Sequence, residues 1–125
     1  MNPLLVDTHA LLWWRGDYQR LGGRAREAIT NPDVALFFSA ASIWEIAIKR
    51  ARGKLNVPVN LLDTMVERGF IELPVRSSHA IVAGALPLHH SDPFDRMIVA
   101  QAQSERLTVV TSDARIAAYD VPVLW

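Results

Sequence analysis

Short apolar runs alternate with helix-compatible segments along this chain, and this alternation limits its fold more than any other feature of the sequence. The first apolar run, residues 4–6, ends at Asp7 and precedes a helix-like segment that stops near Gly16. Strands that regularly alternate with helices form a mostly parallel sheet with helices on both faces. The sequence therefore predicts an α/β fold with a twisted, mostly parallel sheet flanked by helices on both faces.

The bounds of the other elements come from turn and capping signals. Asp92-Pro93 predicts the start of the longest helix, because Asp caps helices well and Pro is tolerated at the first helical position. Gly69 predicts a helix end. The expected strands are residues 4–6, 34–38, 70–75, 107–110 and 121–125, and the expected helices are residues 8–14, 39–49, 60–68, 77–85, 92–106 and 113–118.

The length and composition are those of one globular domain. The chain has 125 residues, and two domains would leave each half too little surface to bury, so we expect one domain over residues 1–125. Half of the residues are apolar, which excludes disorder. The longest uncharged run, residues 77–91, is shorter than the roughly 20 residues of a membrane span. Because the chain also lacks cysteine and a secretory signal pattern, we expect a cytoplasmic protein without a membrane partner.

The charges balance, so the whole molecule attracts a polyanion only weakly. Thirteen basic residues offset thirteen acidic ones, and any nucleic-acid binding must come from local patches. Two stretches qualify: Lys49, Arg50, Arg52 and Lys54 form one, and Arg15, Arg20, Arg24 and Arg26 form the other. Solvated helix ends and loops are the alternative interpretation of both.

Four acidic residues fall near predicted strand ends and helix starts: Asp7, Glu45, Asp95 and Asp113. Ligands of an open parallel sheet bind beyond the carboxyl ends of the strands. Carboxylates gathered there repel one another unless a cation neutralises them. With all-oxygen ligands and no cysteine, that cation is Mg²⁺ or Mn²⁺ rather than Zn²⁺.

Helix capping is the competing interpretation of each acid. Asp7 and Asp113 stand at N-cap positions, and the pairs Ser42/Glu45 and Asp92/Asp95 have capping-box spacing. We interpret Asp92 as a cap rather than a ligand. Capping alone does not explain why four of thirteen acids gather at the same end of the sheet.

Other polar side chains near these acids carry weaker signals. His9, His89 and His90 suggest a metal site, but surface histidines, or histidines that support the ligands without binding the ion, are commoner. The hydroxyls of Thr111 and Ser112 are suited to holding waters or carboxylates, and exposed loop hydroxyls are the alternative.

Four ordered motifs resemble the PIN-domain ribonucleases, in particular the VapC-like toxins of bacterial toxin–antitoxin pairs. They are LLVDTHALLW at residues 4–13, SAASIWEIAIK at 39–49, HSDPFDR at 90–96 and VTSD at 110–113. The resemblance implies that Asp7, Glu45, Asp95 and Asp113 are the catalytic acids that bind Mg²⁺ or Mn²⁺ and that the enzyme cuts RNA. It also implies a homodimer and a cognate antitoxin that covers an apolar groove and places a basic side chain in the acidic pocket.

A metal-dependent hydrolysis of RNA needs no covalent enzyme intermediate. Asp7 and Asp95 are expected to be the most direct ligands, and Glu45 and Asp113 to bind directly or through water, with one of the latter two orienting the attacking water. Lys49, Arg50 and Arg52 are expected to bind the RNA backbone, because these cations have no acidic neighbour until Asp63.

Two alternatives are weighed against this expectation. Phosphotransfer through a nucleophilic aspartate needs a lysine at the end of a late strand, and Lys49 and Lys54 are the only lysines; a phosphate-binding G-x-x-x-x-G-K-[ST] loop is also absent. The second alternative is a non-catalytic protein-interaction module. The evidence for it would be an exposed tryptophan, since Trp13 and Trp14 are adjacent on a predicted helix and point in different directions. One exposed ring would suit a partner protein, whereas core packing of both rings would not.

Overall fold

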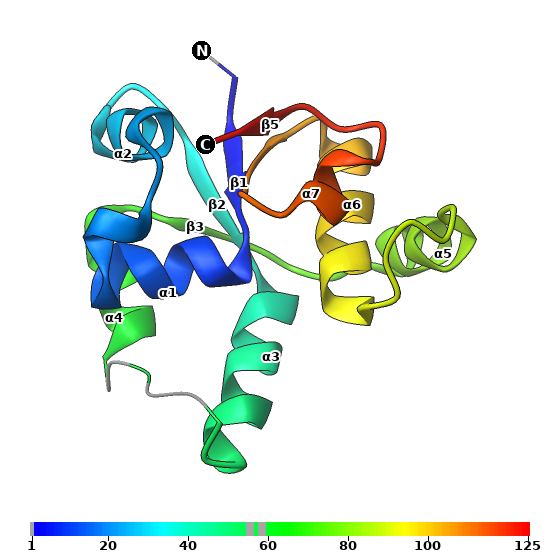
Figure 1. The fold of residues 1–125 in the computed structure, drawn as a ribbon, viewed down its shortest axis with the longest axis horizontal. Helices are drawn as coiled ribbons and strands as arrows, with labels where there is room; N and C mark the ends of the chain where they lie inside the picture. The colour runs from blue at the N-terminus through cyan, green and yellow to red at the C-terminus, as the bar shows by residue number, and fades with distance from the viewer. Residues whose placement is uncertain (1, 55–56, 58–59) are drawn as a thin grey trace.

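Five parallel strands form the sheet of this protein in a computed structural model that describes residues 2–54, 57 and 60–125. The order is β3-β2-β1-β4-β5, with β1 at the centre (Figure 1). The strands are β1 (Leu4–Val6), β2 (Leu36–Ser39), β3 (Ile71–Leu73), β4 (Thr108–Val110) and β5 (Val123–Leu124). Each neighbouring pair is parallel. The predicted parallel α/β architecture is confirmed.

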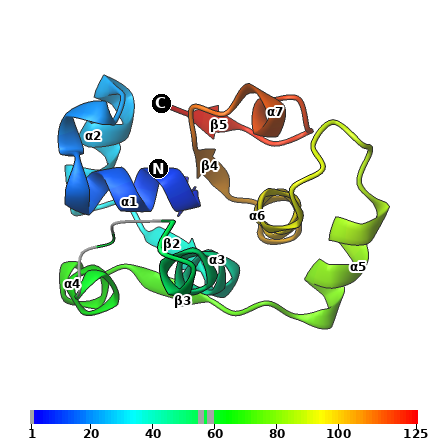
Figure 2. The same cartoon turned by 60° about the horizontal axis from the view of Figure 1, so that its bottom comes forward.

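Helices cover both faces of the sheet because side chains of β1 alternate between the faces. Leu4 and Val6 pack into one core with α1 (Thr8–Gly16), α2 (Gly23–Thr30) and α4 (Leu61–Arg68), whereas Leu5 packs into a second core with α6 (Pro93–Glu105) and α7 (Ala114–Ala117). Figure 2 shows these two groups of helices on opposite sides of the molecule. The helices are α1 (Thr8–Gly16), η1 (Tyr18–Arg20), α2 (Gly23–Thr30), α3 (Ala40–Ala51), α4 (Leu61–Arg68), α5 (Ser77–Ala85), α6 (Pro93–Glu105) and α7 (Ala114–Ala117).

Three differences from the predicted elements concern length and number. The sequence does not predict α2 or η1, and the edge strands β3 and β5 are shorter than the expected 70–75 and 121–125. The apolar run at 34–38 begins pairing only at Leu36.

Among the described residues, no helix combines the length and apolar character that crossing a bilayer requires.

Both adjacent tryptophans of α1 are partly buried and pack against the core. Trp14 lies against Phe70 with ring centroids 5.0 Å apart, and Trp13 lies against Trp125 with centroids 5.6 Å apart. Gly22 makes room for Trp125, since a Cβ at this position would come within 2.5 Å of the Trp125 carbonyl carbon. Of the two interpretations of the pair, the structure favours core packing, with both rings half-buried.

Candidate active site

The four predicted acids lie at the carboxyl edge of the sheet. Asp7 directly follows β1, and Asp113 follows β4, the strand paired with β1. Glu45 lies in the second turn of α3 and Asp95 in the first turn of α6, and α3 packs against both α1 and α6 below this edge (Figure 1). The parallel order of the sheet therefore brings together residues that are more than 100 positions apart in the sequence.

Three aspartates at this edge cap helices, and each does so with a single oxygen. Asp7 Oδ1 accepts a hydrogen bond from Ala10 N at 2.8 Å, and Asp113 Oδ1 accepts one from Arg115 N at 2.8 Å. Asp92 Oδ1 accepts from the backbone N–H groups of two α6 residues, as the sequence predicts. Capping and ligand binding are therefore compatible at Asp7 and Asp113, because the second oxygen is not used by the helix.

Glu45 does not cap a helix. Ser39 caps α3 through its Oγ, which accepts from Ala41 N at 3.0 Å, so the Ser42/Glu45 capping-box interpretation is wrong. The Glu45 side chain is instead buried inside the site with one oxygen, Oε2, 2.6 Å from Lys49 Nζ. Its other oxygen, Oε1, is buried and has no hydrogen-bond partner among the described residues.

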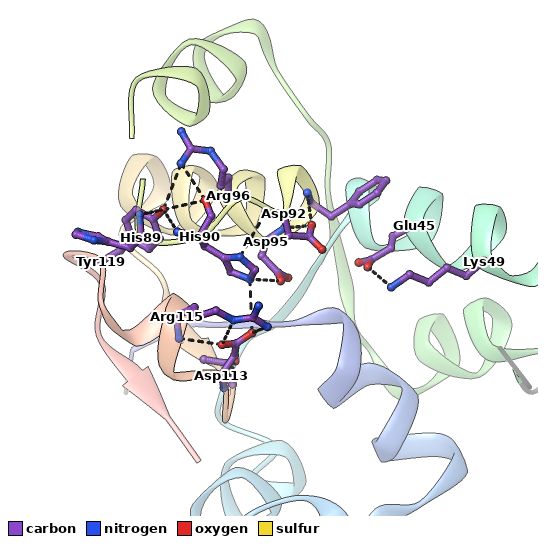
Figure 3. Close-up of polar contacts among 12 residues, drawn as sticks. Glu45, Lys49, His89, His90, Asp92, Asp95, Arg96, Asp113, Arg115 and Tyr119 are labelled. Atoms are coloured by element: carbon purple, nitrogen blue, oxygen red, sulfur yellow. Dashed lines mark hydrogen bonds and ion pairs between the residues drawn. The ribbon is translucent and has the colours of Figure 1, made fainter. Parts of the chain in front are cut away.

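His90 joins two of the acids. Its Nε2 lies 2.8 Å from Asp95 Oδ2 and 3.6 Å from Asp113 Oδ2, and its ring is almost fully buried (Figure 3). Its Nδ1 accepts from Asp92 N at 3.3 Å, so the proton of the neutral imidazole is on Nε2 and is donated to Asp95. His90 therefore acts as a support of the acids, which is the role that the sequence favoured for the histidines.

The loop before α6, which carries His90, is held by Arg96 and Tyr119. The Arg96 guanidinium donates to the carbonyl oxygens of Ala83, Leu86, Pro87 and His90. Tyr119 Oη donates to Pro87 O at 2.7 Å and accepts from His90 N at 3.0 Å. These bonds fix the backbone on both sides of the histidine that contacts Asp95.

Thr111 connects two of the acids, Asp7 and Asp113, through its side chain. Thr111 is buried, its Oγ1 accepts from Asp113 N at 3.0 Å, and its side chain hydrogen-bonds Asp7. The interpretation of Thr111 as an exposed loop hydroxyl is thus wrong, whereas Ser112 is exposed. Thr8 Oγ1 donates to Ser42 Oγ at 2.9 Å and ties α1 to α3 next to the site.

The acids act on one another electrostatically. Burial, with repulsion from Asp92 and Glu45, raises the pKa of Asp95 to about 6. Burial also raises the pKa of Asp7. At Asp113 burial acts in the same direction, but the hydrogen bonds from Arg115 outweigh it and lower the pKa of Asp113. A negative charge is therefore costly on Asp7 and Asp95 and stabilised on Asp113.

Of the three basic residues expected to bind substrate, the structure brings only Lys49 to the acids. Its hydrogen bond with Glu45 raises the pKa of Lys49. Arg50 and Arg52 are exposed further along α3, towards its C-terminus, and neither contacts the four acids among the described residues.

The donor set suits a hard divalent cation. One ligand atom each from His90, Asp95 and Asp113 lies within 4.8 Å of the others, and Asp7 and Glu45 contribute repulsion at Asp95. Among the described residues, Glu45 Oε1 has no hydrogen-bond partner, and the pKa of Asp95 is raised. A bound cation would give Oε1 a partner and would lower the pKa of Asp95. Carboxylate oxygens dominate the set, which is the chemistry that Mg²⁺ and Mn²⁺ prefer.

Sequence reasoning missed three contributors to the site. Arg96 and Tyr119 act through backbone carbonyls and N–H groups, for which the sequence holds no pattern. Arg115 contacts both oxygens of Asp113. Its position two residues after a helix-capping acid is a signal that could have found it.

Comparisons with known proteins agree with this geometry. The family model described as PIN domain matches residues 4–122. Ribonuclease VapC22 of Mycobacterium tuberculosis (strain ATCC 25618 / H37Rv) is 32% identical over 125 residues, which cover 98% of this chain and 95% of that protein. The structure of DNA-bound VapBC from Salmonella typhimurium aligns with a TM-score of 0.71 at 20% identity, covering 99% of this chain and 98% of that one. VapBC2 from Rickettsia felis, bound to a promoter DNA fragment, aligns with a TM-score of 0.70 at 13% identity over 97% and 96% of the two chains. At these identities the two structures establish the fold alone.

Proposed function

The chain belongs to the PIN-domain family, and from this premise we propose that it is an endoribonuclease that uses Mg²⁺ or Mn²⁺ to hydrolyse RNA phosphodiester bonds. The observation that carries the proposal is the buried, unpartnered Glu45 Oε1 beside Asp95, a carboxyl group whose pKa is raised by neighbouring acids. A fold gains nothing from such an arrangement unless a cation binds there. The name of the relative, a ribonuclease, supports RNA as the substrate.

Asp7, Glu45, Asp95 and Asp113 are the proposed catalytic acids and metal ligands. Asp7 and Asp95 are assigned as direct ligands because their carboxylates are charged only at a cost without a cation. When bound, the cation neutralises charge at the phosphate and lowers the pKa of a water molecule. His90 supports this arrangement by holding the Asp95 carboxylate through Nε2.

Glu45 is the better candidate for orienting the attacking water. Both oxygens of Asp113 already accept hydrogen bonds from Arg115, whereas Glu45 Oε1 is unpartnered among the described residues. A water molecule that donates to Oε1 would be held in place. As the water oxygen bonds to phosphorus and the bond from phosphorus to the leaving 3′ oxygen breaks, Glu45 would take up the proton of the water and the 3′ oxygen would take a proton from solvent. Lys49 neutralises Oε2, which keeps the glutamate in position, and presents a cation to the RNA backbone. Arg50 and Arg52 would contact the RNA strand further away, at the C-terminal end of α3.

The biological role that fits this family is the toxin of a toxin–antitoxin pair in the cytoplasm, where RNA is available. The structural neighbours are toxin–antitoxin complexes, which supports a cognate antitoxin and a homodimer for this chain as well. Residues 1–125 act as a single nuclease domain in this proposal. We interpret Asp92 as the cap of α6 and leave it outside the ligand set.

A second candidate function is a non-catalytic protein-interaction module. The observation that favours it is an apolar groove of about 420 Å³ lined by α3 and α6 side chains, among which Trp44 is 65% exposed. Such a groove suits the apolar segment of a partner protein. The same groove is compatible with a nuclease that binds an antitoxin, so only the catalytic test separates the two functions.

The test keeps the helix caps and removes the charges. Asn caps helices about as well as Asp, so Asp7→Asn and Asp113→Asn keep their caps, and Asp95→Asn and Glu45→Gln keep the shape of side chains that do not cap. All four changes are nearly harmless if these acids are only structural. In the nuclease, each change lowers the rate of cleavage of an RNA pool by several orders of magnitude, most of all at Asp7 and Asp95, because a charged ligand is lost.

The matched control is Asp92→Asn, which keeps the cap of α6 and retains most of the activity. EDTA stops cleavage by the parent protein, and Mg²⁺ or Mn²⁺ restores it. Equal cleavage by all four variants and the parent would remove the nuclease proposal and leave the interaction module.

A further inference from the structure

Arg115 is a cation at the acid cluster whose hydrogen-bonding capacity is only partly used. Its Nε donates to Asp113 Oδ1 at 3.2 Å and its Nη2 donates to Asp113 Oδ2 at 3.1 Å. A guanidinium has five N–H donors, so three remain, including both on Nη1. The side chain is 65% exposed, and its free donors have no other acceptor among the described residues.

The other cations near the site are already engaged. Arg96 donates to four backbone carbonyl oxygens, and Lys49 lies 2.6 Å from Glu45 Oε2. Of the three, Arg115 alone combines a planar fork with several free donors facing solvent.

Arg115 lies at the edge of the acid cluster, next to Asp113. It pairs with Asp113, whose Oδ2 lies 3.6 Å from His90 Nε2, and its pKa is raised by the hydrogen bond with Asp113 and by the charges of Asp95 and Asp92. In Figure 3 the carboxylates of Asp95 and Glu45 lie between His90 and Lys49, with Arg115 on the His90 side. The acid cluster thus has a cation at each end, one from α7 and one from α3.

The guanidinium is not needed to hold Asp113. The backbone N–H of Arg115 already fixes Asp113 Oδ1 in the N-cap, and the buried Thr111 Oγ1 accepts from Asp113 N. An ion pair as exposed as this one contributes little to folding. The side chain is therefore available for a second anion.

We propose that Arg115 binds a non-bridging phosphate oxygen of the RNA backbone next to the acid cluster, opposite Lys49, while its other edge stays on Asp113. The planar fork of arginine matches two oxygens at once, which a point charge cannot do. This proposal rests on the proposed nuclease function and identifies a substrate-binding residue outside the expected patch of Lys49, Arg50 and Arg52.

The test measures RNA binding apart from cleavage. Arg115→Gln and Arg115→Lys are combined with Asp95→Asn, and the affinity for a single-stranded RNA oligonucleotide is measured with Mg²⁺ over a range of salt concentrations. Arg115→Gln is expected to weaken binding about tenfold, since a charge-assisted hydrogen bond is lost. The slope of log affinity against log salt should fall by about 0.7, the value of one phosphate contact on a single strand. Arg115→Lys should keep the slope and lose part of the affinity.

Arg106→Gln in the same Asp95→Asn background is the control and should keep the affinity and the salt slope, because Arg106 is exposed just before β4, at the opposite end of that strand from Asp113. Thermal melts in EDTA show whether the Arg115 variants keep the parent's fold. An unchanged affinity and salt slope in Arg115→Gln, with a parent protein that cleaves RNA, would overturn the role of Arg115 and leave the nuclease proposal standing. A parent that does not cleave RNA with either metal would overturn the proposed function itself.

Discussion

At the scale of single residues, the aspartates of the site show that one carboxylate serves two purposes. Oδ1 of Asp7 and Oδ1 of Asp113 cap the N-termini of their helices. The Asp7 side chain also hydrogen-bonds Thr111, and Asp113 Oδ2 lies 3.6 Å from His90 Nε2. Sequence reasoning treats capping and ligand binding as competing explanations, and it finds the right residues because both explanations point to the same positions. The oxygen that each purpose uses is a matter of geometry, which the sequence does not contain.

Asp95 predicts an unusual pH dependence of stability in the absence of metal. Its pKa of about 6 lies above the model-compound value of 3.8, so the folded state binds its proton more tightly than the unfolded state. The stabilisation from this group is complete below about pH 4 and is lost as the pH rises through 6. In EDTA, Asp95→Asn should raise the free energy of unfolding above about pH 7 by about 1 to 2 kcal/mol, a figure reduced for solvent screening.

The comparison is urea unfolding of the parent and Asp95→Asn at several pH values in EDTA. The advantage of the variant should disappear towards about pH 4, where Asp95 is protonated in the parent. A variant that is less stable than the parent at neutral pH would show that the charge of Asp95 is satisfied without a cation.

At the scale of elements, the Tyr119 hydroxyl is one of the two groups that hold the loop between α5 and α6. Tyr119→Phe removes the acceptor of the buried His90 N, whereas Pro87 O keeps its hydrogen bonds from Arg96 and from His89 N. Leaving a buried N–H unsatisfied costs about 1 to 3 kcal/mol of stability. We expect a lower melting temperature and slower RNA cleavage, because the backbone that places His90 against Asp95 loosens.

Tyr18→Phe is the matched control for this prediction. Tyr18 lies on η1, and its hydroxyl makes no hydrogen bond among the described residues. Hydrogen exchange at residues 86–90 should increase in the Tyr119 variant and stay unchanged in the Tyr18 variant. Equal stability of the two variants would mean that Arg96 alone holds the loop.

The elements that the sequence predicts well are those with a strong pattern at both ends. β1, α3 and α6 have apolar runs bounded by capping residues. α2 is missed because it begins at a pair of glycines and buries only Ala25, Ala28 and Ile29. Its arginines make the hydropathy pattern of the segment polar, so the apolar face of the helix is hard to recognise. The sequence favours a supporting role for the histidines but does not indicate which acid His90 contacts, since only the folded loop brings its Nε2 to Asp95.

At the scale of the whole molecule, a bound cation should stabilise the fold, because it binds a site that exists only when strands and helices from the entire chain meet. At a metal concentration 100 times the dissociation constant, the gain is about 2.7 kcal/mol. Thermal melts of the parent in Mg²⁺, Mn²⁺ and EDTA measure the effect, and Asp7→Asn should reduce it. Equal melting temperatures at millimolar metal would contradict a shared cation site among these acids.

The central position of β1 has a consequence for how such a nuclease comes into being. Along the chain, β1 comes well before its neighbour β4, and the acid Asp113 follows β4. Until β4 has been synthesised, the nascent polypeptide therefore has an open sheet edge at β1 and an incomplete set of acids. We expect the proposed nuclease to become active only after β4 has paired with β1.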